Sequence, residues 1–211
     1  MIISMKSKFI VIEGNEGVGK SSQIESIKDY LEQHNVDFVL TREPGGTEIG
    51  DKLRGIILNE NYQTEPTTDA LMFYASRFEN FSKIILPALE NNKTVLCDRF
   101  HYSTYIYQGV IEKNDLVKKI HNIFDKIFSG KIDHIIYFYT SPDESYKRIS
   151  RRANTDKFES KGLEYLKSLN KAYEELFSKL DNVIKIDTSK DKIITKEVLY
   201  RELDKIFQND K

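Results

Sequence analysis

Short apolar runs and segments of helical periodicity alternate along the whole chain. The runs are rich in β-branched residues and end at a glycine or a polar residue, which is typical of strands buried on both faces of a parallel sheet. Between the runs, apolar side chains recur every three or four residues, which predicts amphipathic helices. Strands joined by helices in this way form right-handed β-α-β units. We therefore expect an α/β fold with a five-stranded parallel sheet covered by helices on both faces.

The boundaries of these elements follow from where each pattern starts and stops. We expect strands at residues 8–13, 37–41, 94–98, 134–140 and 183–186. We expect helices at residues 20–34, 49–57, 67–91, from Pro142 onward, 163–180 and 195–207. Pro87 is expected to break or kink the longest of them, because proline lacks a backbone donor and its ring clashes with the preceding turn. The polar stretch 153–162 has no apolar period, so it is predicted to be a loop between two helices.

Length and composition suit one soluble domain spanning residues 1–211. Lys and Arg number 32 and Asp and Glu number 33, so no basic excess points to nucleic acid. No apolar run approaches the ~18 residues of a membrane span, and the first residues do not form a signal peptide. Cys97 is interpreted as a small buried residue and His101 as a surface residue, and the histidines show no metal-site spacing. We therefore expect a cytoplasmic protein without membrane or nucleic-acid partners.

The segment from Gly14 to Ser21, GNEGVGKS, matches the phosphate-binding pattern G-x-x-x-x-G-K-[ST] in full. It follows a predicted buried strand and begins a predicted helix, which is the context the pattern requires. Its glycines let backbone N–H groups close around phosphate oxygens at the positive end of the helix dipole. Lys20 adds a charge near the β- and γ-phosphates, and Ser21 offers a hydroxyl to Mg²⁺. This phosphate loop predicts a P-loop NTPase three-layer fold that binds a nucleoside triphosphate; the alternative is a glycine-rich turn without a ligand.

Further candidate residues follow the second and third predicted strands. The third strand ends in Asp98, an acid that in P-loop folds helps to place Mg²⁺, and Arg99 follows at the edge where α/β proteins bind ligands. The second strand leads into TREPGGT at residues 41–47, whose Arg and Glu suit an anion or a hydroxyl. Phe73 and Arg77 share a helix face, so together they suit a nucleotide base. Each feature has a plainer alternative: a structural ion pair, an ordinary Pro-Gly turn and a core phenylalanine.

Four segments in this order, GNEGVGKSSQ, TREPGGT, LMFYASR and DRFHYSTYIYQG, closely resemble the thymidylate kinase (dTMP kinase) family. The resemblance runs from about residue 8 to residue 187. TREPGGT together with the DR-x-x-x-S-T-x-x-YQG segment is much more discriminating than the phosphate loop. The resemblance implies transfer of the γ-phosphate of ATP to dTMP, giving ADP and dTDP, with Mg²⁺. It also implies a homodimer, for which the predicted helix 67–91 is a candidate face.

The resemblance implies a pocket for the acceptor dTMP. Phe73 would stack on the thymine ring, Arg77 would bond a thymine carbonyl, and Tyr107 would crowd the sugar 2′ carbon and disfavour ribose. Two arginines, Arg99 and Arg42, would hold the phosphate of dTMP. The other residues implied for the base and sugar pocket are Ser103, Thr104 and Gln108.

The resemblance also implies the donor side of the site. Glu16 in the phosphate loop would contact the acceptor's 3′-hydroxyl and help to place the reacting groups. The residues implied for ATP are Gly14, Asn15, Glu16, Gly17, Val18, Gly19, Lys20, Ser21, Ser22 and Arg148. The residues implied for the magnesium shell are Ser21, Asp98 and Glu43. Lys20, Glu16 and Arg99 would take part in catalysis.

The transition state needs a further cation, because phosphoryl transfer relies on positioning and positive charge and the phosphate loop contains no arginine. Arg148, Arg151 and Arg152 share one face of a predicted helix beside the polar loop. This resembles the bacterial-type arrangement, in which a lid, here at about residues 148–162, closes and delivers an arginine. We assign the catalytic role to Arg151 and expect Arg148 to pack near the adenine or phosphates of ATP. A solvated basic helix end is the alternative.

Two other functions stay open on the sequence. Another nucleoside monophosphate or deoxynucleoside kinase would share the phosphate loop, although TREPGGT weighs against it. A non-catalytic nucleotide-binding switch would have no acceptor pocket, and Phe73, Arg77 and Arg99 would then have no shared purpose.

Overall fold

A five-stranded parallel sheet forms the centre of the protein, in a computed structural model that describes residues 7–59, 61–151 and 161–208. Its strands are β1 (Phe9–Glu13), β2 (Phe38–Arg42), β3 (Thr94–Asp98), β4 (His134–Tyr139) and β5 (Val183–Asp187). They lie in the order β2-β3-β1-β4-β5, and every neighbouring pair is parallel. The predicted strands are confirmed, with ends that differ by at most about one residue from the pattern.

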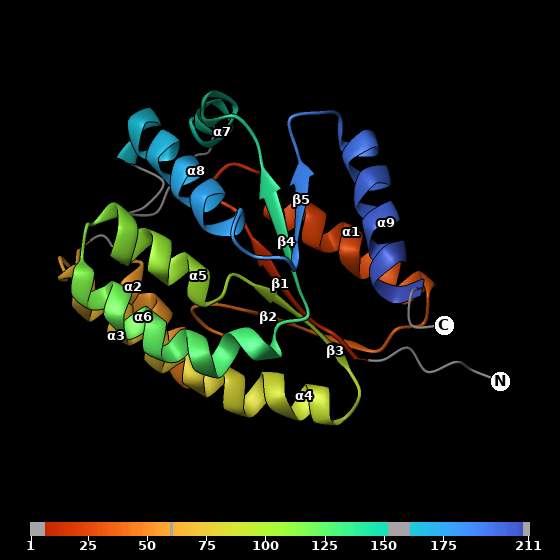
Figure 1. The fold of residues 1–211 in the computed structure, drawn as a ribbon, viewed down its shortest axis with the longest axis horizontal. Helices are drawn as coiled ribbons and strands as arrows, with labels where there is room; N and C mark the ends of the chain where they lie inside the picture. The colour runs from red at the N-terminus through yellow and green to blue at the C-terminus, as the bar shows by residue number, and fades with distance from the viewer. Residues whose placement is uncertain (1–6, 60, 152–160, 209–211) are drawn as a thin grey trace.

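Helices cover both faces of this sheet (Figure 1). One face carries α1 (Lys20–Gln33) and α9 (Lys192–Gln208), and the other carries α3 (Pro66–Asn80), α4 (Leu86–Glu90), α5 (His101–Thr104), α6 (Asp115–Phe128) and α8 (Leu163–Phe177). Successive residues of β1 point to opposite faces, so Val11 belongs to one core and Ile12 to the other. Both faces are buried, which explains the unbroken apolar run and confirms the three-layer α/β fold.

Local capping sets the starts of the two remaining predicted helices. The Thr47 hydroxyl accepts from the N–H of Gly50 at 3.0 Å, where α2 (Glu48–Ile57) begins. The Ser141 hydroxyl accepts from the N–H of Glu144 at 3.2 Å, where α7 (Pro142–Ile149) begins with proline in its first turn. None of the helices in the described ranges is both long and apolar enough to cross a membrane.

The chain stays helical through Pro87. A π-helical turn, η1 (Phe81–Ile85), joins α3 to α4, and the N–H of Leu86 bonds to the carbonyl of Phe81, five residues earlier. Pro87 lies in the first turn of α4. The wider turn accommodates a proline without ending the helix, because it shifts the hydrogen-bond pattern just where the proline donor is missing. The long predicted helix is therefore confirmed, and of the predicted break or kink at Pro87 the helix does not show the break.

The segment between β3 and β4 is helical, although the predicted elements leave it out. It contains α5, a π-helical segment η2 (Tyr105–Ile111), α6 and a short 3-10 turn η3 (Ser129–Lys131). Asn114 begins α6 by accepting from the N–H groups of Leu116 and Val117, at 3.1 Å each. The cap and the apolar spacing of α6 are readable from the sequence, whereas η2 follows no regular helical period.

A buried polar cluster lies between α3, α5 and α6. His101 has no exposed surface, so its interpretation as a surface residue is wrong, whereas the burial expected for Cys97 is confirmed. Nε2 of His101 lies 2.9 Å from Oδ1 of Asp125, and Nδ1 of His121 lies 3.3 Å from the hydroxyl of Tyr74. Burial lowers the pKa of His101 to about 4 and the pKa of His121 to about 3. Both rings are therefore neutral at pH 7.

His101 and His121 are each expected to lower stability as the pH drops below about 6.5, the ordinary pKa of histidine, whereas the buried Glu43, whose pKa is raised to about 7, acts in the opposite direction. In the folded state His101 and His121 take up protons only near pH 4 and pH 3. Above those values the unfolded state holds more protons, so each histidine removes about 1.4 kcal/mol of stability per pH unit. Urea unfolding at pH 7, 6 and 5 measures this slope. A His101→Asn, His121→Asn variant should lose the part of the slope that the two histidines contribute, and an equal slope in variant and wild type would contradict the assignment.

Candidate active site

The carboxyl ends of β2, β3 and β1 bring the candidate residues to one edge of the sheet. Asp98 is in register with Arg42 on one side and with Ile12 on the other, so the loops after these strands start side by side. A cavity of about 570 Å³ opens at this edge. It is lined by Asn15, Glu16, Gly17, Gly19, Lys20, Ser21, Ser22, Arg42, Glu43, Pro44, Arg54, Leu58, Phe73, Arg77, Asp98, Arg99, Phe100, Ser103, Thr104, Tyr107 and Gln108. Of the predicted site residues in the described ranges, all but Gly14, Val18, Arg148 and Arg151 line it.

The phosphate loop adopts a shape that only glycine permits at two positions. Gly14 has φ +148°, and a Cβ there would clash with the carbonyl oxygen of Phe138. Gly17 has φ +75°, and a Cβ there would lie 2.6 Å from the carbonyl oxygen of Ser145. The side chain of Val18 is buried in the core beneath α1, so this residue can serve a ligand only through its backbone. The shape of the loop thus depends on its glycines, and its role as an anion site stays a prediction.

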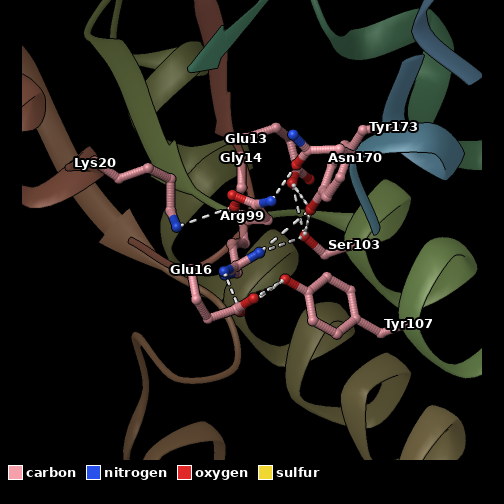
Figure 2. A network of polar contacts seen from close by, with 10 residues as sticks. Glu13, Gly14, Glu16, Lys20, Arg99, Ser103, Tyr107, Asn170 and Tyr173 are labelled. Atoms are coloured by element: carbon pink, nitrogen blue, oxygen red, sulfur yellow. Dashed lines mark hydrogen bonds and ion pairs between the residues drawn. The ribbon is translucent and has the colours of Figure 1, made fainter. Parts of the chain in front are cut away.

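Lys20 folds back over the phosphate loop. Its Nζ donates to the carbonyl of Gly14 at 3.1 Å (Figure 2). Burial and the neighbouring Arg99 lower the pKa of Lys20, and the carboxylates of Asp98 and Glu16 oppose this shift. A compact cation is therefore held at the loop, next to acids that can interact with a metal ion.

Ser21 and Asp98 offer oxygen ligands at the same place. Both line the cavity, and both also line an adjoining cavity of about 640 Å³. Oδ1 of Asp98 is buried and has no hydrogen-bond partner in the described part of the chain. A buried carboxylate oxygen without a partner is costly, and a hard cation such as Mg²⁺ would satisfy it. The residues present therefore fit a magnesium ion.

A buried ion pair joins the turn after β2 to α3. Nε of Arg77 donates to Oε2 of Glu43 at 2.6 Å, and both side chains are 1% exposed. Asn80 donates to the other oxygen of Glu43 at 3.3 Å. Burial raises the pKa of Glu43 to about 7, although Arg77 opposes the shift. In this geometry Glu43 holds Arg77, and its part in a magnesium shell stays a prediction.

Arg77 and Gln108 provide one buried donor and one buried acceptor among the cavity-lining residues. Nη1 of Arg77 and Oε1 of Gln108 are both buried without a hydrogen-bond partner within the described ranges. Nη2 of Arg77 donates to the hydroxyl of Thr104 at 3.2 Å, and the guanidinium lies 4.9 Å from the ring centre of Tyr74. The plane of the guanidinium is thereby fixed. Phe73 lines the same cavity and is half-buried.

Arg99, Glu16 and Tyr107 form a connected group (Figure 2). Nη2 of Arg99 lies 2.9 Å from Oε1 of Glu16, and the Tyr107 hydroxyl lies 2.7 and 2.8 Å from the two oxygens of Glu16. Arg99 has φ +67°, in the left-handed region that is unfavourable for a residue with a side chain. Such strain persists only where the surroundings hold the residue, and it is typical of functional sites.

Glu13, behind the cavity, is an acid that the sequence analysis missed. It is fully buried at the end of β1. It accepts hydrogen bonds from the N–H of Phe100 at 3.0 Å, the hydroxyl of Ser103 at 2.6 Å and the hydroxyl of Tyr173 at 3.1 Å. Burial raises the pKa of Glu13, and the nearby Arg99 opposes this shift.

Two polar residues of α8 were missed as well. Asn170 bonds to Asn15 of the phosphate loop and to the backbone of Thr140, and Tyr173 contacts Glu13. Glu13 had a signal, since it is a charged residue at the end of an apolar run. The sequence contains no signal for a polar role of the Tyr173 side chain, because its spacing along α8 is that of a core face.

The two described arginines predicted to serve ATP and the transition state, Arg148 and Arg151, lie outside the cavity. The guanidinium of Arg148 donates to the backbone oxygen of Thr188 at 2.9 Å and lies 3.5 Å from that of Gly17, on the outer side of the phosphate loop. Arg151 is exposed just after α7. Arg152 and most of the predicted lid at 148–162 lie outside the described residues. The roles of these arginines therefore stay predictions.

Comparison with known proteins gives consistent matches. A protein-family model described as "Thymidylate kinase" matches residues 12–198. The thymidylate kinase of Francisella tularensis subsp. holarctica (strain FTNF002-00 / FTA) is 38% identical over 206 residues, covering 96% of this chain and 98% of that protein. The thymidylate kinase of Caldicellulosiruptor saccharolyticus (strain ATCC 43494 / DSM 8903 / Tp8T 6331) is 34% identical over 184 residues, covering 85% and 88%. The family match includes every residue that lines the cavity.

Proposed function

Because the chain belongs to the thymidylate kinase family, we propose that it is an enzyme that transfers the γ-phosphate of ATP to dTMP, giving ADP and dTDP. The observation that carries this proposal is a single cavity lined both by the phosphate loop and by Phe73 and Arg77. A nucleotide switch needs only the first half of such a cavity, whereas a kinase needs donor and acceptor to meet in one space. We place this reaction in the cytoplasm, where an ATP-dependent step of nucleotide synthesis is expected.

On the donor side, the phosphate loop holds the phosphates of ATP. The backbone N–H groups of the loop and the start of α1 favour an anion, and Lys20 adds its charge there. Ser22 lines the same part of the cavity. Arg148, held between the carbonyls of Gly17 and Thr188, presents a planar guanidinium suited to packing on the adenine.

Ser21 and Asp98 are the residues that would hold Mg²⁺. When bound, the ion neutralises charge on the phosphate oxygens of ATP and orients them. The buried and unpartnered Oδ1 of Asp98 supports this placement. Both oxygens of Glu43 are engaged by Arg77 and Asn80, so Glu43 would support the magnesium shell without contacting the ion directly.

On the acceptor side, the thymine ring enters between Phe73 and the buried polar groups. The ring of Phe73 stacks on it, and Nη1 of Arg77 donates to a thymine carbonyl. Oε1 of Gln108 accepts from the ring N–H, and Thr104 holds Arg77 in place. One donor and one acceptor match the hydrogen-bonding edge of thymine, and leaving them unpaired would be costly.

The sugar and phosphate of dTMP then lie next to Arg99, the arginine with the unfavourable backbone conformation. Arg99 and Arg42 line the cavity and offer two guanidinium groups to the phosphate, with Ser103 beside them. Glu16 accepts from the 3′-hydroxyl of the sugar. Tyr107, whose hydroxyl lies against both oxygens of Glu16, leaves little space next to the 2′ carbon.

The rate of phosphoryl transfer depends on cations placed around the transferred group. Lys20 and Arg99 line the cavity and supply two of these cations. We propose that Arg151, exposed just after α7, adds the third cation when it moves toward the phosphates of ATP. This movement would also exclude water and limit wasteful hydrolysis of ATP.

A panel of acceptors tests the proposed function. Release of ADP is measured with dTMP, dUMP, UMP, CMP and AMP, and with ATP alone. We expect the fastest release with dTMP, poor to moderate release with dUMP, and almost none with UMP, because Tyr107 crowds the 2′ position. Equal rates with UMP and dTMP would contradict the role of Tyr107. The kinase assignment fails if dTMP adds nothing to the rate with ATP alone, and a faster rate with CMP or AMP would favour another monophosphate kinase.

We further propose that the chain forms a homodimer through the outer faces of α2, α3 and α6. These helices lie next to one another in the fold (Figure 1). Their exposed apolar residues are Ile49, Ile56, Leu71, Leu116, Ile123 and Ile127. Covering such side chains stabilises an assembly by about 25 cal/mol for each Å² of apolar surface removed from water.

Sedimentation velocity tests the dimer. Wild type is expected to sediment as a dimer, and Ile123→Glu, at a side chain that is 63% exposed, is expected to sediment as a monomer. The matched control is Ile193→Glu on α9, where the side chain is 71% exposed. The control should remain dimeric. A monomeric wild type, or a dimer that survives Ile123→Glu, would contradict this interface.

A further inference from the structure

We infer that Glu13, at the carboxyl end of β1, is a positioning residue that orients Ser103 and Tyr173 so that they hold Arg99 for the phosphate of dTMP. The inference rests on the proposed function, in which Arg99 binds that phosphate. Glu13 is fully buried and does not line the cavity, and Tyr173 does not line it either. Both therefore act on a substrate only through other residues (Figure 2).

The direction of the hydrogen bonds carries the inference. Nη1 of Arg99 lies 3.2 Å from the oxygen of Ser103 and 3.3 Å from the oxygen of Tyr173. A guanidinium only donates, so both hydroxyl oxygens must accept from it. Their own hydrogens must then point elsewhere, and Oε2 of Glu13 lies 2.6 Å from Ser103 and 3.1 Å from Tyr173. The two hydroxyl oxygens also lie 3.1 Å from each other, but a charged carboxylate is the stronger acceptor. Because a carboxylate only accepts, it draws both hydrogens to itself and leaves the hydroxyl lone pairs facing Arg99.

The other oxygen of Glu13 holds the backbone next to Arg99. Oε1 accepts from the N–H of Phe100 at 3.0 Å. The N–H of Arg99 itself bonds to the carbonyl of Ile12, the residue before Glu13, at 2.8 Å. Arg99 has φ +67°, a backbone conformation that is unfavourable for arginine, so it needs hydrogen bonds from its surroundings to hold it. The end of β1 therefore supports the backbone of Arg99 as well as its guanidinium.

Arg99 is held from two sides that differ in their access to substrate. Glu16 binds Nη2 and lines the cavity, so it meets the substrate directly. Ser103 and Tyr173 bind Nη1; Ser103 also lines the cavity, whereas Tyr173 and Glu13 behind it do not. Loss of Glu13 should thus misplace the guanidinium and leave the thymine end of the cavity intact. Loss of Glu13 should therefore weaken the binding of a ligand that carries a phosphate. It should leave the binding of the same ligand without its phosphate unchanged.

The test compares dTMP with thymidine, which lacks the phosphate, in wild type and Glu13→Gln. Glutamine keeps the shape, but its amide donates to the hydroxyls and turns their hydrogens toward Arg99. We expect the dissociation constant of dTMP to rise by about 10-fold or more, and the inhibition constant of thymidine to change by less than about twofold. The KM for ATP should also change by less than about twofold. A loss caused only by weaker folding would affect dTMP and thymidine alike.

Tyr173→Phe provides a second, milder variant, because it removes one of the two hydroxyls and keeps the ring. It should weaken the binding of dTMP, but not that of thymidine, by a smaller factor than Glu13→Gln does. It also tests the inference if Glu13→Gln does not fold. The matched control is Tyr137→Phe, whose buried ring stacks on Tyr173 with centroids 5.2 Å apart. This control should leave the ratio of dTMP to thymidine binding unchanged.

Two results would overturn the inference. The first is an unchanged ratio of dTMP to thymidine binding in the folded variants. The second is tighter binding of dTMP by Glu13→Gln, which would mean that Glu13 acts only as a negative charge near the phosphate. Failure of the proposed function is visible separately, because wild type would then release no additional ADP when dTMP is added.

Discussion

Alanine in place of Arg151 is expected to lower kcat by about 10³-fold or more, the scale that transition-state arginines contribute to phosphoryl transfer. The phosphate loop supplies Lys20 but no arginine, and negative charge on the transferred group needs a further cation. Arg151 is exposed just after α7, so it can take part only after a closing movement. The measurement is steady-state release of ADP at saturating ATP and dTMP.

Two neighbouring residues provide the comparison for Arg151. Lys147 is a cation on α7 whose side chain is 61% exposed, and Lys147→Ala should leave kcat within about twofold. Arg148→Ala should raise the KM for ATP more than it lowers kcat, because we place Arg148 beside the nucleotide. An unchanged kcat in Arg151→Ala would move the catalytic role to Arg148 or Arg152.

Methionine in place of Arg77 is expected to lower the free energy of unfolding by about 3–5 kcal/mol, because it leaves the buried carboxyl of Glu43 without its ion-pair partner. Glu43 is 1% exposed and faces Arg77 at 2.6 Å. The pKa of Glu43 is already raised to about 7, from an ordinary value of 4.5, by burial. Without the arginine the carboxyl must be protonated in the folded state, so the loss should be small at pH 5 and grow toward pH 8. Urea unfolding at both pH values measures it.

A double variant separates folding from recognition at this pair. Arg77→Met with Glu43→Leu removes both charges, so it should recover most of the lost stability. Turnover of dTMP should stay low, because the Nη1 donor for the thymine carbonyl is gone. Lys52→Ala, at an ion pair whose side chains are 72% and 84% exposed, is the matched control and should scarcely change stability. Normal dTMP turnover in the double variant would contradict the thymine-binding role of Arg77.

Most elements of the fold were predictable from the sequence because their signals are local. The strands follow from apolar runs, and the starts of α2 and α7 follow from caps at Thr47 and Ser141. The same signals existed for α6, which the interpretation left out. The helix does not break at Pro87, because η1, one turn earlier, changes the hydrogen-bond pattern. No local rule predicts such a turn.

The lining of the candidate site was largely predictable as well. Parallel strands bring their carboxyl ends to one edge, so loops that follow different strands must meet there. This is why Arg42, Asp98 and the phosphate loop line one cavity. The partners of the lining residues were not predictable. The sequence suggested Glu43 for a metal, whereas its closest partner is Arg77, 34 residues away in the chain.

The sequence by itself determined the strands, the glycine-dependent shape of the phosphate loop and the kinds of side chain carried to the edge of the sheet. These depend on neighbours along the chain: on alternation, on permitted φ angles and on helical spacing. Only the tertiary structure decided which polar atoms satisfy one another. Glu13 and Tyr173 are 160 residues apart, and they meet because α8 packs on the face of the sheet behind Arg99. A buried hydroxyl follows the same helical spacing as a core ring, so its role appears only when its partner is placed beside it.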